Sequence, residues 1–135
     1  MDFESSRRLM VILVENAARI LRERFGVDRT ESVFFEIIDL LRDESALRVP
    51  FLAMVEKTLE LRDPTGLEEG CIPRELTELV AHELRWPELR QLADARIVRY
   101  FGGDRSLAAS DISVSIDEAY RNDWEDREFY KRYAT

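Results

Sequence analysis

The clearest pattern of apolar and polar positions lies between Pro73 and Ile97, where one helical spacing occurs twice. Apolar residues at i, i+3, i+4 and i+8 form one face of an amphipathic helix. Trp86-Pro87 separates the two runs, and proline is tolerated as the first residue of a helix but breaks a helix in its interior. The first run is Leu76, Leu79, Val80 and Leu84, and the second is Leu89, Leu92, Ala93 and Ile97. We therefore predict a helix, a tight corner and a second helix.

The residues before this segment carry similar spacing and predict three further helices. The first is expected from about Ser5 to Phe25, because Gly26 is a residue type that commonly follows the end of a helix. Thr30 is expected to cap the second helix, and Pro50 to begin the third. Their apolar stripes are Leu9, Ile12, Leu13, Ala17 and Ile20; Val33, Phe34, Ile37, Ile38 and Leu41; and Phe51, Leu52, Met54, Val55 and Leu59.

Turn signals and one alternating segment organise the rest of the chain. Asp63-Pro64-Thr65-Gly66 is a turn sequence. Residues 112–116 alternate like a strand but have no evident partner strand, so a final helix over residues 112–133, capped by Ser113 or Ser115, is the better interpretation. The pattern predicts an all-α fold of five to seven helices, arranged as a compact bundle or a short stack of antiparallel helix pairs, in a single domain of 135 residues.

Composition and charge restrict the classes of protein that fit this pattern. A hydrophobic content of 45% argues against disorder, and 36% charged residues argue against a membrane protein. The apolar run from Leu9 to Val14 is shorter than the apolar region of a signal peptide, which has roughly 7–15 residues. The single cysteine, Cys71, fits a reducing compartment, so a cytoplasmic location is expected. A net charge of −8 disfavours nucleic acid and anionic membranes as partners and favours a basic protein.

No residue set with the spacing of a catalytic, metal or cofactor site is evident. His82 precedes Glu83, but the position that would hold the second histidine of a zinc-protease helix is Trp86. A nucleophilic Cys71–His82 pair is conceivable, yet no acid or oxyanion-binding signature accompanies it. We expect Cys71 to be a semi-buried apolar residue and His82 to lie on a solvated helix face, with no catalytic activity, no metal and no cofactor.

Three polar residues fall on the predicted apolar stripes. Asn16, Glu83 and Arg96 each lie seven residues, or nearly two helical turns, after a stripe residue. Buried polar groups require partners. Glu83 and Arg96 are badly placed to pair with each other, because both lie late in adjacent helices of opposite direction. We expect each to contact a different element or to reach the edge of its stripe.

The C-terminal segment carries the strongest signal for partner binding. From Asp111 to the end of the chain, seven acidic and four basic residues are interleaved with aromatic ones. Aromatic side chains bury large areas at interfaces, and surrounding acids select a basic partner. The residues expected to bind the partner are Asp117, Asp123, Trp124, Glu125, Asp126, Glu128 and Tyr130. Alternatively, Trp124 docks this helix on the core while the carboxylates stay exposed.

Two parts of the sequence resemble known helical proteins. Pro87-Glu88-Leu89-Arg90, followed by Ala93 and Ile97, resembles the second helix of a HEAT-type repeat. The corner over residues 84–89 and the ending over residues 123–130 are similar to small acidic helical immunity proteins of bacterial toxin–immunity systems. This second resemblance implies a cytoplasmic inhibitor whose acidic side chains meet the basic cleft of a toxin. A HEAT-like helical adaptor without catalytic activity is the alternative, and an uncharacterised enzyme is a third class.

Overall fold

The computed structural model describes residues 2–23 and 27–121, and all regular structure within them is helical, as predicted. The elements are α1 (Phe3–Arg22), α2 (Val27–Asp43), the short 3-10 helix η1 (Ser45–Leu47), α3 (Arg48–Glu60), α4 (Arg74–Leu84), α5 (Pro87–Phe101) and α6 (Ile112–Arg121). The six α-helices of the described residues fall within the predicted range of five to seven.

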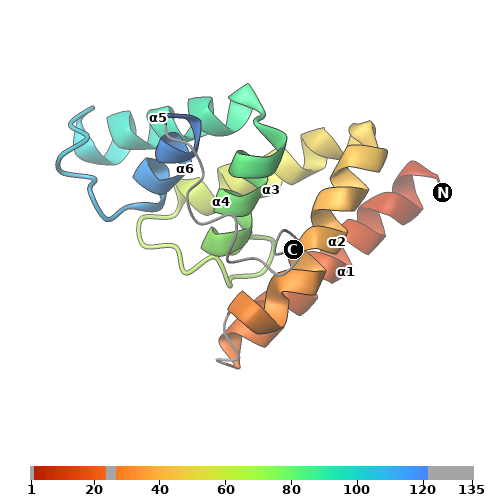
Figure 1. The fold of residues 1–135 in the computed structure, drawn as a ribbon. Coiled ribbons are helices and arrows are strands. Elements are labelled where there is room, and N and C mark those ends of the chain that lie inside the picture. The colour runs from red at the N-terminus through yellow and green to blue at the C-terminus, as the bar shows by residue number, and fades with distance from the viewer. Residues whose placement is uncertain (1, 24–26, 122–135) are drawn as a thin grey trace, which may run out of the picture.

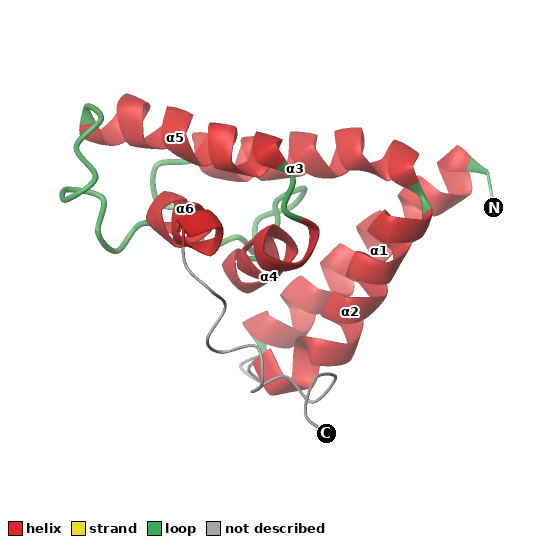
Figure 2. Cartoon of the chain, turned by 45° about the horizontal axis from the view of Figure 1, so that its top comes forward, coloured by secondary structure: helices red, strands yellow, loops and turns green. Residues whose placement is uncertain are grey.

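The helices pack in pairs, and most of these pairs join elements that are separated in sequence (Figure 1). α1 and α2 form a hairpin on one side of the molecule. α3 lies beside α5, although α4 stands between them in sequence. α6 packs against both α4 and α5, and Figure 2 views α4 and α6 nearly end-on below α5. The prediction of packed helix pairs is confirmed.

The corner at Trp86-Pro87 turns the chain between α4 and α5. Arg85 follows the last residue of α4 in the left-handed conformation, with φ of 55°, and Pro87 is the first residue of α5. α4 then packs against α2 and α6, whereas α5 packs against α3 and α6. The predicted corner is confirmed, and its two helices share α6 as a neighbour while each packs against one further helix.

The core lies where the helix pairs meet. Its largest fully buried side chains are Phe34, Phe51, Met10, Ile37, Ile38, Leu47, Ile72, Leu76, Leu79, Leu89, Ile116 and Val14. Trp86 is 8% exposed, and its ring meets that of Phe51 edge-on with the ring centroids 5.9 Å apart. Edge-to-face contacts add about 0.5–1.5 kcal/mol beyond the burial of area. The corner is therefore anchored in the core.

The buried face of α1 differs from the predicted stripe. Met10, Val14, Ala17 and Ala18 are buried, whereas Ile12 is 51% exposed. The predicted stripe was right for Ala17 and wrong for Ile12, and its other members, Leu9, Leu13 and Ile20, are half-buried. Because residues 9–14 are all apolar, the spacing fits two neighbouring faces of the helix equally well. The small side chains of Ala17 and Ala18 favour the observed face, because they let α1 lie close to α2.

Two predicted helix starts are displaced, and α6 begins at Ile112 as predicted but with a different capping residue. Thr30 lies inside α2, which begins at Val27, and Pro50 lies in the first turn of α3, which begins at Arg48. α6 is preceded by Asp111, whose carboxylate accepts a hydrogen bond from the backbone N–H of Ser113 at 3.0 Å. Asp111 thus takes the capping role that was assigned to serine. The hydroxyl of Ser113 donates to the same carboxylate, so this serine binds the cap and does not act as the cap. The predicted continuation of this helix to residue 133 lies outside the described residues.

Candidate functional site

Arg96 is buried on α5, as its position in the stripe predicted. Its Nε and one Nη donate to the carboxylate of Asp111 at 2.8 and 2.9 Å. Its Nη atoms also donate to the carbonyl oxygens of Leu59, Leu61 and Arg62, at 2.7, 2.6 and 3.0 Å. Arg96 therefore ties α5 to the end of α3, to the following loop and to the start of α6. Burial opposes the charge on Asp111, but hydrogen bonds from Arg96 and Ser113 outweigh it and hold the pKa of Asp111 below its usual value.

Glu83 also contacts a different element from Arg96, as predicted. Its carboxylate is almost fully buried and pairs with Arg42 of α2 at 2.7 Å. This pair crosses between α2 and α4, which pack together. Asn16, the third residue of that group, is exposed on α1, because the buried face of that helix is not the predicted one. Arg96 and Glu83 thus link different pairs of elements, and the three residues are not grouped into one site.

Asp117 does not lie on the exposed acidic surface that the sequence predicted. It is 1% exposed, and its carboxylate contacts Arg90, Arg105 and Arg121 at 3.1, 3.1 and 2.8 Å. The correction has a physical cause, since three guanidinium groups from α5, the following turn and α6 supply the hydrogen bonds that a buried carboxylate needs. The other predicted partner-binding residues, Asp123, Trp124, Glu125, Asp126, Glu128 and Tyr130, lie outside the described residues.

Cys71 and His82 occupy different parts of the fold. Cys71 is buried in the loop before α4, as expected for a small apolar residue, and His82 is half-buried near the end of α4. Among residues 2–23 and 27–121, no group of three or more histidine, cysteine, aspartate or glutamate side chains is arranged to hold a metal ion. Within the same residue ranges, none of the helices combines the length and the apolar character needed to cross a membrane.

The described surface is hollowed along the line where α3 and α5 lie side by side. The hollow has a volume of about 410 Å³. Its lining residues are Val49, Leu52, Ala53 and Glu56 from α3, and Glu88, Gln91 and Leu92 from α5. These positions follow helical spacing on each helix. Leu52 and Leu92 also pack against the core, so the hollow runs along the edge of the core-facing stripes. We name this feature the α3–α5 groove.

The groove continues along the two helices into a smaller hollow of about 120 Å³, which shares Glu56 and Leu92 with it. Glu60, Ala95 and Arg99 are among the residues that line this extension. Glu56 and Glu60 are both exposed, so two carboxylates border an apolar floor. Leu52 and Leu92 pack against the core, as their predicted stripes indicated, and line the groove as well, so their spacing gave no separate sign of the groove. The sequence feature that could have indicated the groove is Val49, an apolar residue outside the predicted stripe.

The two ends of the groove differ in charge. At the start of α3, Arg48 donates to both carboxylate oxygens of Glu88, at 2.5 and 2.9 Å, and its guanidinium stacks over Trp86. These hydrogen bonds lower the pKa of Glu88 below its usual value. The charge of Glu88 is therefore neutralised locally. Towards the end of α3, the extension is lined by Glu56, Glu60 and Arg99, together with Arg96, whose charge is balanced by Asp111. The acidic excess at this end is therefore one carboxylate.

The acids beside the central loop are partly committed to contacts within the chain. Glu68 accepts hydrogen bonds from the backbone N–H and the hydroxyl of Thr65, both at 2.8 Å. Partial burial raises the pKa of Glu68, but these hydrogen bonds outweigh it and the pKa is lowered. Glu78 pairs with Arg74 at 3.0 Å on the same helix. These contacts make the loop a less suitable acidic surface than the groove.

No protein-family model matches this chain, and neither a curated protein nor a solved structure matches it.

Proposed function

We propose that this chain is an acidic protein-binding module whose α3–α5 groove receives an amphipathic, basic segment of a protein partner. The observation that carries the proposal is the apolar stripe exposed along two adjacent helices. Val49 is 74% exposed on α3, and Leu52 and Leu92 beside it are only partly buried. Apolar side chains aligned at helical spacing along a groove suit the apolar face of a helical segment.

Charge supports a basic partner. The chain carries 28 acidic against 20 basic residues, and the carboxylates of Glu56 and Glu60 border the apolar floor of the groove. Acidic groups around an apolar centre accelerate association with a cationic partner and disfavour acidic competitors. The acidic residues between positions 123 and 128, which the sequence predicts to bind the partner, would add to the attraction for a cationic partner.

The more specific form of the proposal is an inhibitor of the immunity type, which binds a basic toxin or enzyme and blocks its active cleft. It assigns no catalytic step, metal or cofactor to this chain. A helical adaptor would use the same groove to hold a partner without affecting that partner's activity. The two forms differ in one measurement, the activity of the captured partner with and without this chain.

The test is affinity capture from the native cell with the full chain at low and moderate salt. Val49→Asp places a charge in the groove, and Glu56→Lys reverses one carboxylate at its border. Val98→Asp is the matched control, because Val98 is 66% exposed on α5 but does not line the groove. Circular dichroism and thermal melting show that all variants are folded.

We expect the wild-type chain and Val98→Asp to retain the same basic protein, and Val49→Asp to lose it. Glu56→Lys should weaken capture mainly at low salt, because exposed charges are screened beyond roughly 8–10 Å at physiological ionic strength. Equal capture by Val49→Asp and Val98→Asp would remove the groove from the interface. Capture of acidic proteins only would contradict the proposed partner chemistry.

A further inference from the structure

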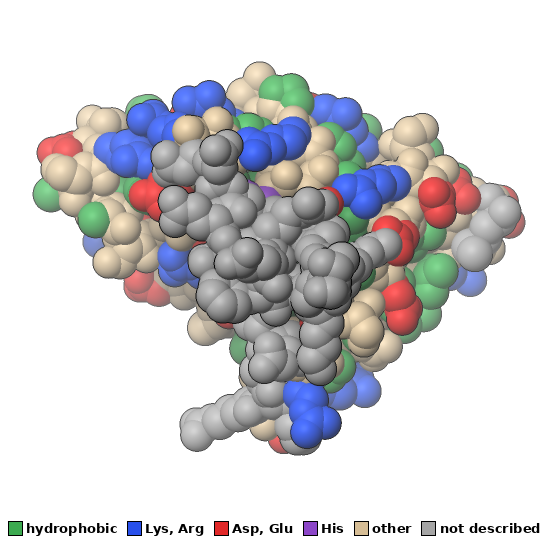
Figure 3. Space-filling view, in the orientation of Figure 1, with side chains coloured by type: hydrophobic (Ala, Val, Ile, Leu, Met, Phe, Trp, Pro, Cys, Tyr) green, Lys and Arg blue, Asp and Glu red, His purple; other side chains and the backbone are tan. Residues whose placement is uncertain are grey.

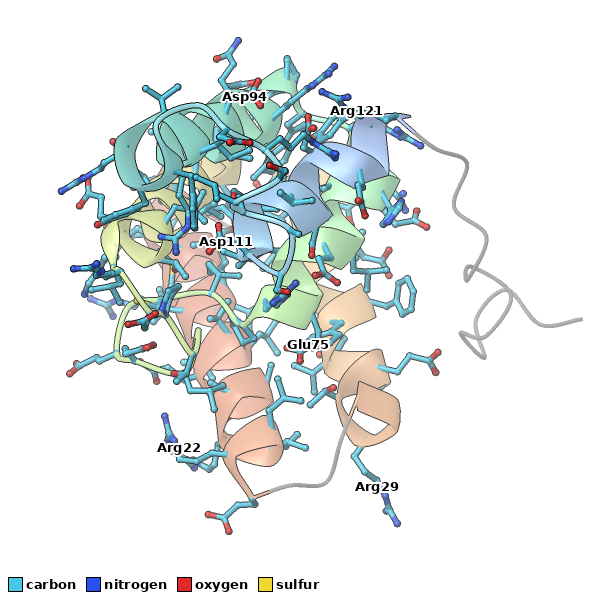
Figure 4. The ribbon with its side chains drawn as sticks, turned by 90° about the vertical axis from the view of Figure 1, so that its left-hand side faces the viewer. Arg22, Arg29, Glu75, Asp94, Asp111 and Arg121 are labelled. Carbon is cyan, nitrogen blue, oxygen red and sulfur yellow. The ribbon has the colours of Figure 1, made fainter. Side chains whose placement is uncertain are left out.

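Positive charge gathers around α6, although the net charge of the chain is −8. Arg90 from α5, Arg105 from the turn after α5, and Arg121 from the end of α6 all direct their Nε atoms at Asp117. Figure 3 shows basic side chains, in blue, along the part of the surface formed by α5, and Figure 4 shows Arg121 at the far end of α6 from Asp111. We call Arg90, Arg105 and Arg121 the arginine cluster.

The cluster holds more positive charge than Asp117 requires. Three guanidinium groups face one buried carboxylate and Glu118, whose oxygen lies 3.7 Å from an Nη atom of Arg105. Arg85 adds a fourth positive charge beside α6. It donates to the carbonyl of Ala119 at 2.5 Å and stacks over the ring of Tyr120. Four positive charges against two negative ones leave a local charge of about +2, since guanidinium stays protonated at all accessible pH values.

The guanidinium groups of the cluster are partly exposed and can make further hydrogen bonds. Each arginine uses its Nε for Asp117, and the side chains of Arg90, Arg105 and Arg121 are 44%, 39% and 51% exposed. The Nη2 atom of Arg105 is itself buried and faces the Glu118 carboxylate at 3.7 Å, too far for a hydrogen bond.

We infer that the arginine cluster is a binding site for a phosphate monoester group. Planar guanidinium forks match the oxygen geometry of phosphate, and several of them held by a common carboxylate are already oriented before the ligand arrives. A phosphate monoester carries a charge of about −1.5 to −2 at neutral pH, which matches the local charge of the cluster. A long polyanion is disfavoured, because the rest of the chain would repel it.

This inference is independent of the proposed function, since the cluster and the α3–α5 groove share no residue. Asp117 serves here as a positioning residue that orients the three guanidinium groups. The ligand is either a small phosphorylated molecule or a phosphorylated side chain of another protein. A sugar phosphate and a short phosphoserine peptide distinguish these two sources.

The test is isothermal titration calorimetry of the full chain with inorganic phosphate at neutral pH, against sodium chloride of equal ionic strength. Arg90→Gln and Arg121→Gln each remove one guanidinium fork. Arg7→Gln is the matched control, because Arg7 is an exposed arginine that pairs with Glu4 on α1. Circular dichroism establishes that each variant is folded.

We expect saturable phosphate binding that each cluster variant weakens about tenfold, as expected for the loss of a hydrogen bond between charged groups. Arg7→Gln should bind phosphate like the wild-type chain. Asp117→Asn, where it folds, should not abolish binding, because the cationic groups remain. If a cluster variant unfolds, the titration of the wild-type chain still shows whether phosphate binds. No saturable heat, or equal weakening by Arg7→Gln, would show that the arginines serve Asp117 alone.

Discussion

The role of Arg96 illustrates which residue properties can be predicted from sequence. Its place on the apolar stripe of α5 predicted burial, and the need of a buried charge for partners predicted contacts with another element. The partners themselves could not be predicted, because three of them are backbone carbonyls that carry no sequence signal. Asp117 was misassigned for a related reason, since its partners Arg90 and Arg105 come from segments whose packing the sequence does not specify.

We predict that Arg96→Met lowers the free energy of unfolding by about 3–5 kcal/mol, the usual cost of removing one partner of a buried ion pair. The loss arises because Asp111 and the carbonyls bound by Arg96 keep their burial but lose their donor. Urea denaturation measures the effect. Arg8→Ala, at an exposed position of α1, should change stability by no more than about 0.5 kcal/mol. Equal stability of both variants would contradict the central role of Arg96.

Asp111 also predicts how stability depends on pH. Its pKa is lower in the folded state than the unfolded value of about 3.9, so its ion pair contributes fully above that pH. The contribution is lost as the pH falls through the folded pKa. We therefore predict that Asp111→Asn reduces the difference in unfolding free energy between neutral pH and pH values below the unfolded pKa. An unchanged difference, measured by urea denaturation, would contradict this assignment.

At the scale of elements, the helices with a single apolar face were predicted most accurately. α2 buries Phe34, Ile37, Ile38 and Leu41, all members of its predicted stripe. In α1, by contrast, a continuous apolar run fits more than one face. In α3 and α5, Leu52 and Leu92 contact the core and line the groove as well, and helical spacing indicates only the first of these roles. The groove residues were missed for this reason.

The corner between α4 and α5 gives a prediction at this scale. Trp86 is buried against Phe51, and its carbonyl accepts a hydrogen bond from the hydroxyl of Tyr120 at 2.6 Å. Trp86→Ala should therefore lower the free energy of unfolding by about 3–5 kcal/mol, as for other large buried aromatic residues. Chemical denaturation provides the measurement. Leu107→Ala, at an exposed apolar residue, is the control and should have an effect below about 0.5 kcal/mol.

At the scale of the whole molecule, net charge proved a poor guide to where charges lie. The excess of acidic residues predicted a basic partner, and the acidic border of the α3–α5 groove is consistent with that expectation. The net charge gave no indication of the arginine cluster, because a sum over all residues does not show which charged side chains the fold brings together. The pairing of α3 with α5 and of α4 with α6 was equally hidden, since each pair joins helices separated in sequence.

The loop after α3 has an unusual consequence for engineering. Within residues 59–69, six backbone carbonyls accept hydrogen bonds from side chains. The donors are Arg96, to three of these carbonyls, and Tyr100, Arg22 and Lys57, to one each. Most surface loops accept added residues, because their polar groups bond to water and their length is unconstrained. An insertion here would move carbonyls away from fixed donors, so we expect this loop to tolerate an inserted epitope or fluorophore poorly, although it lies between two helices.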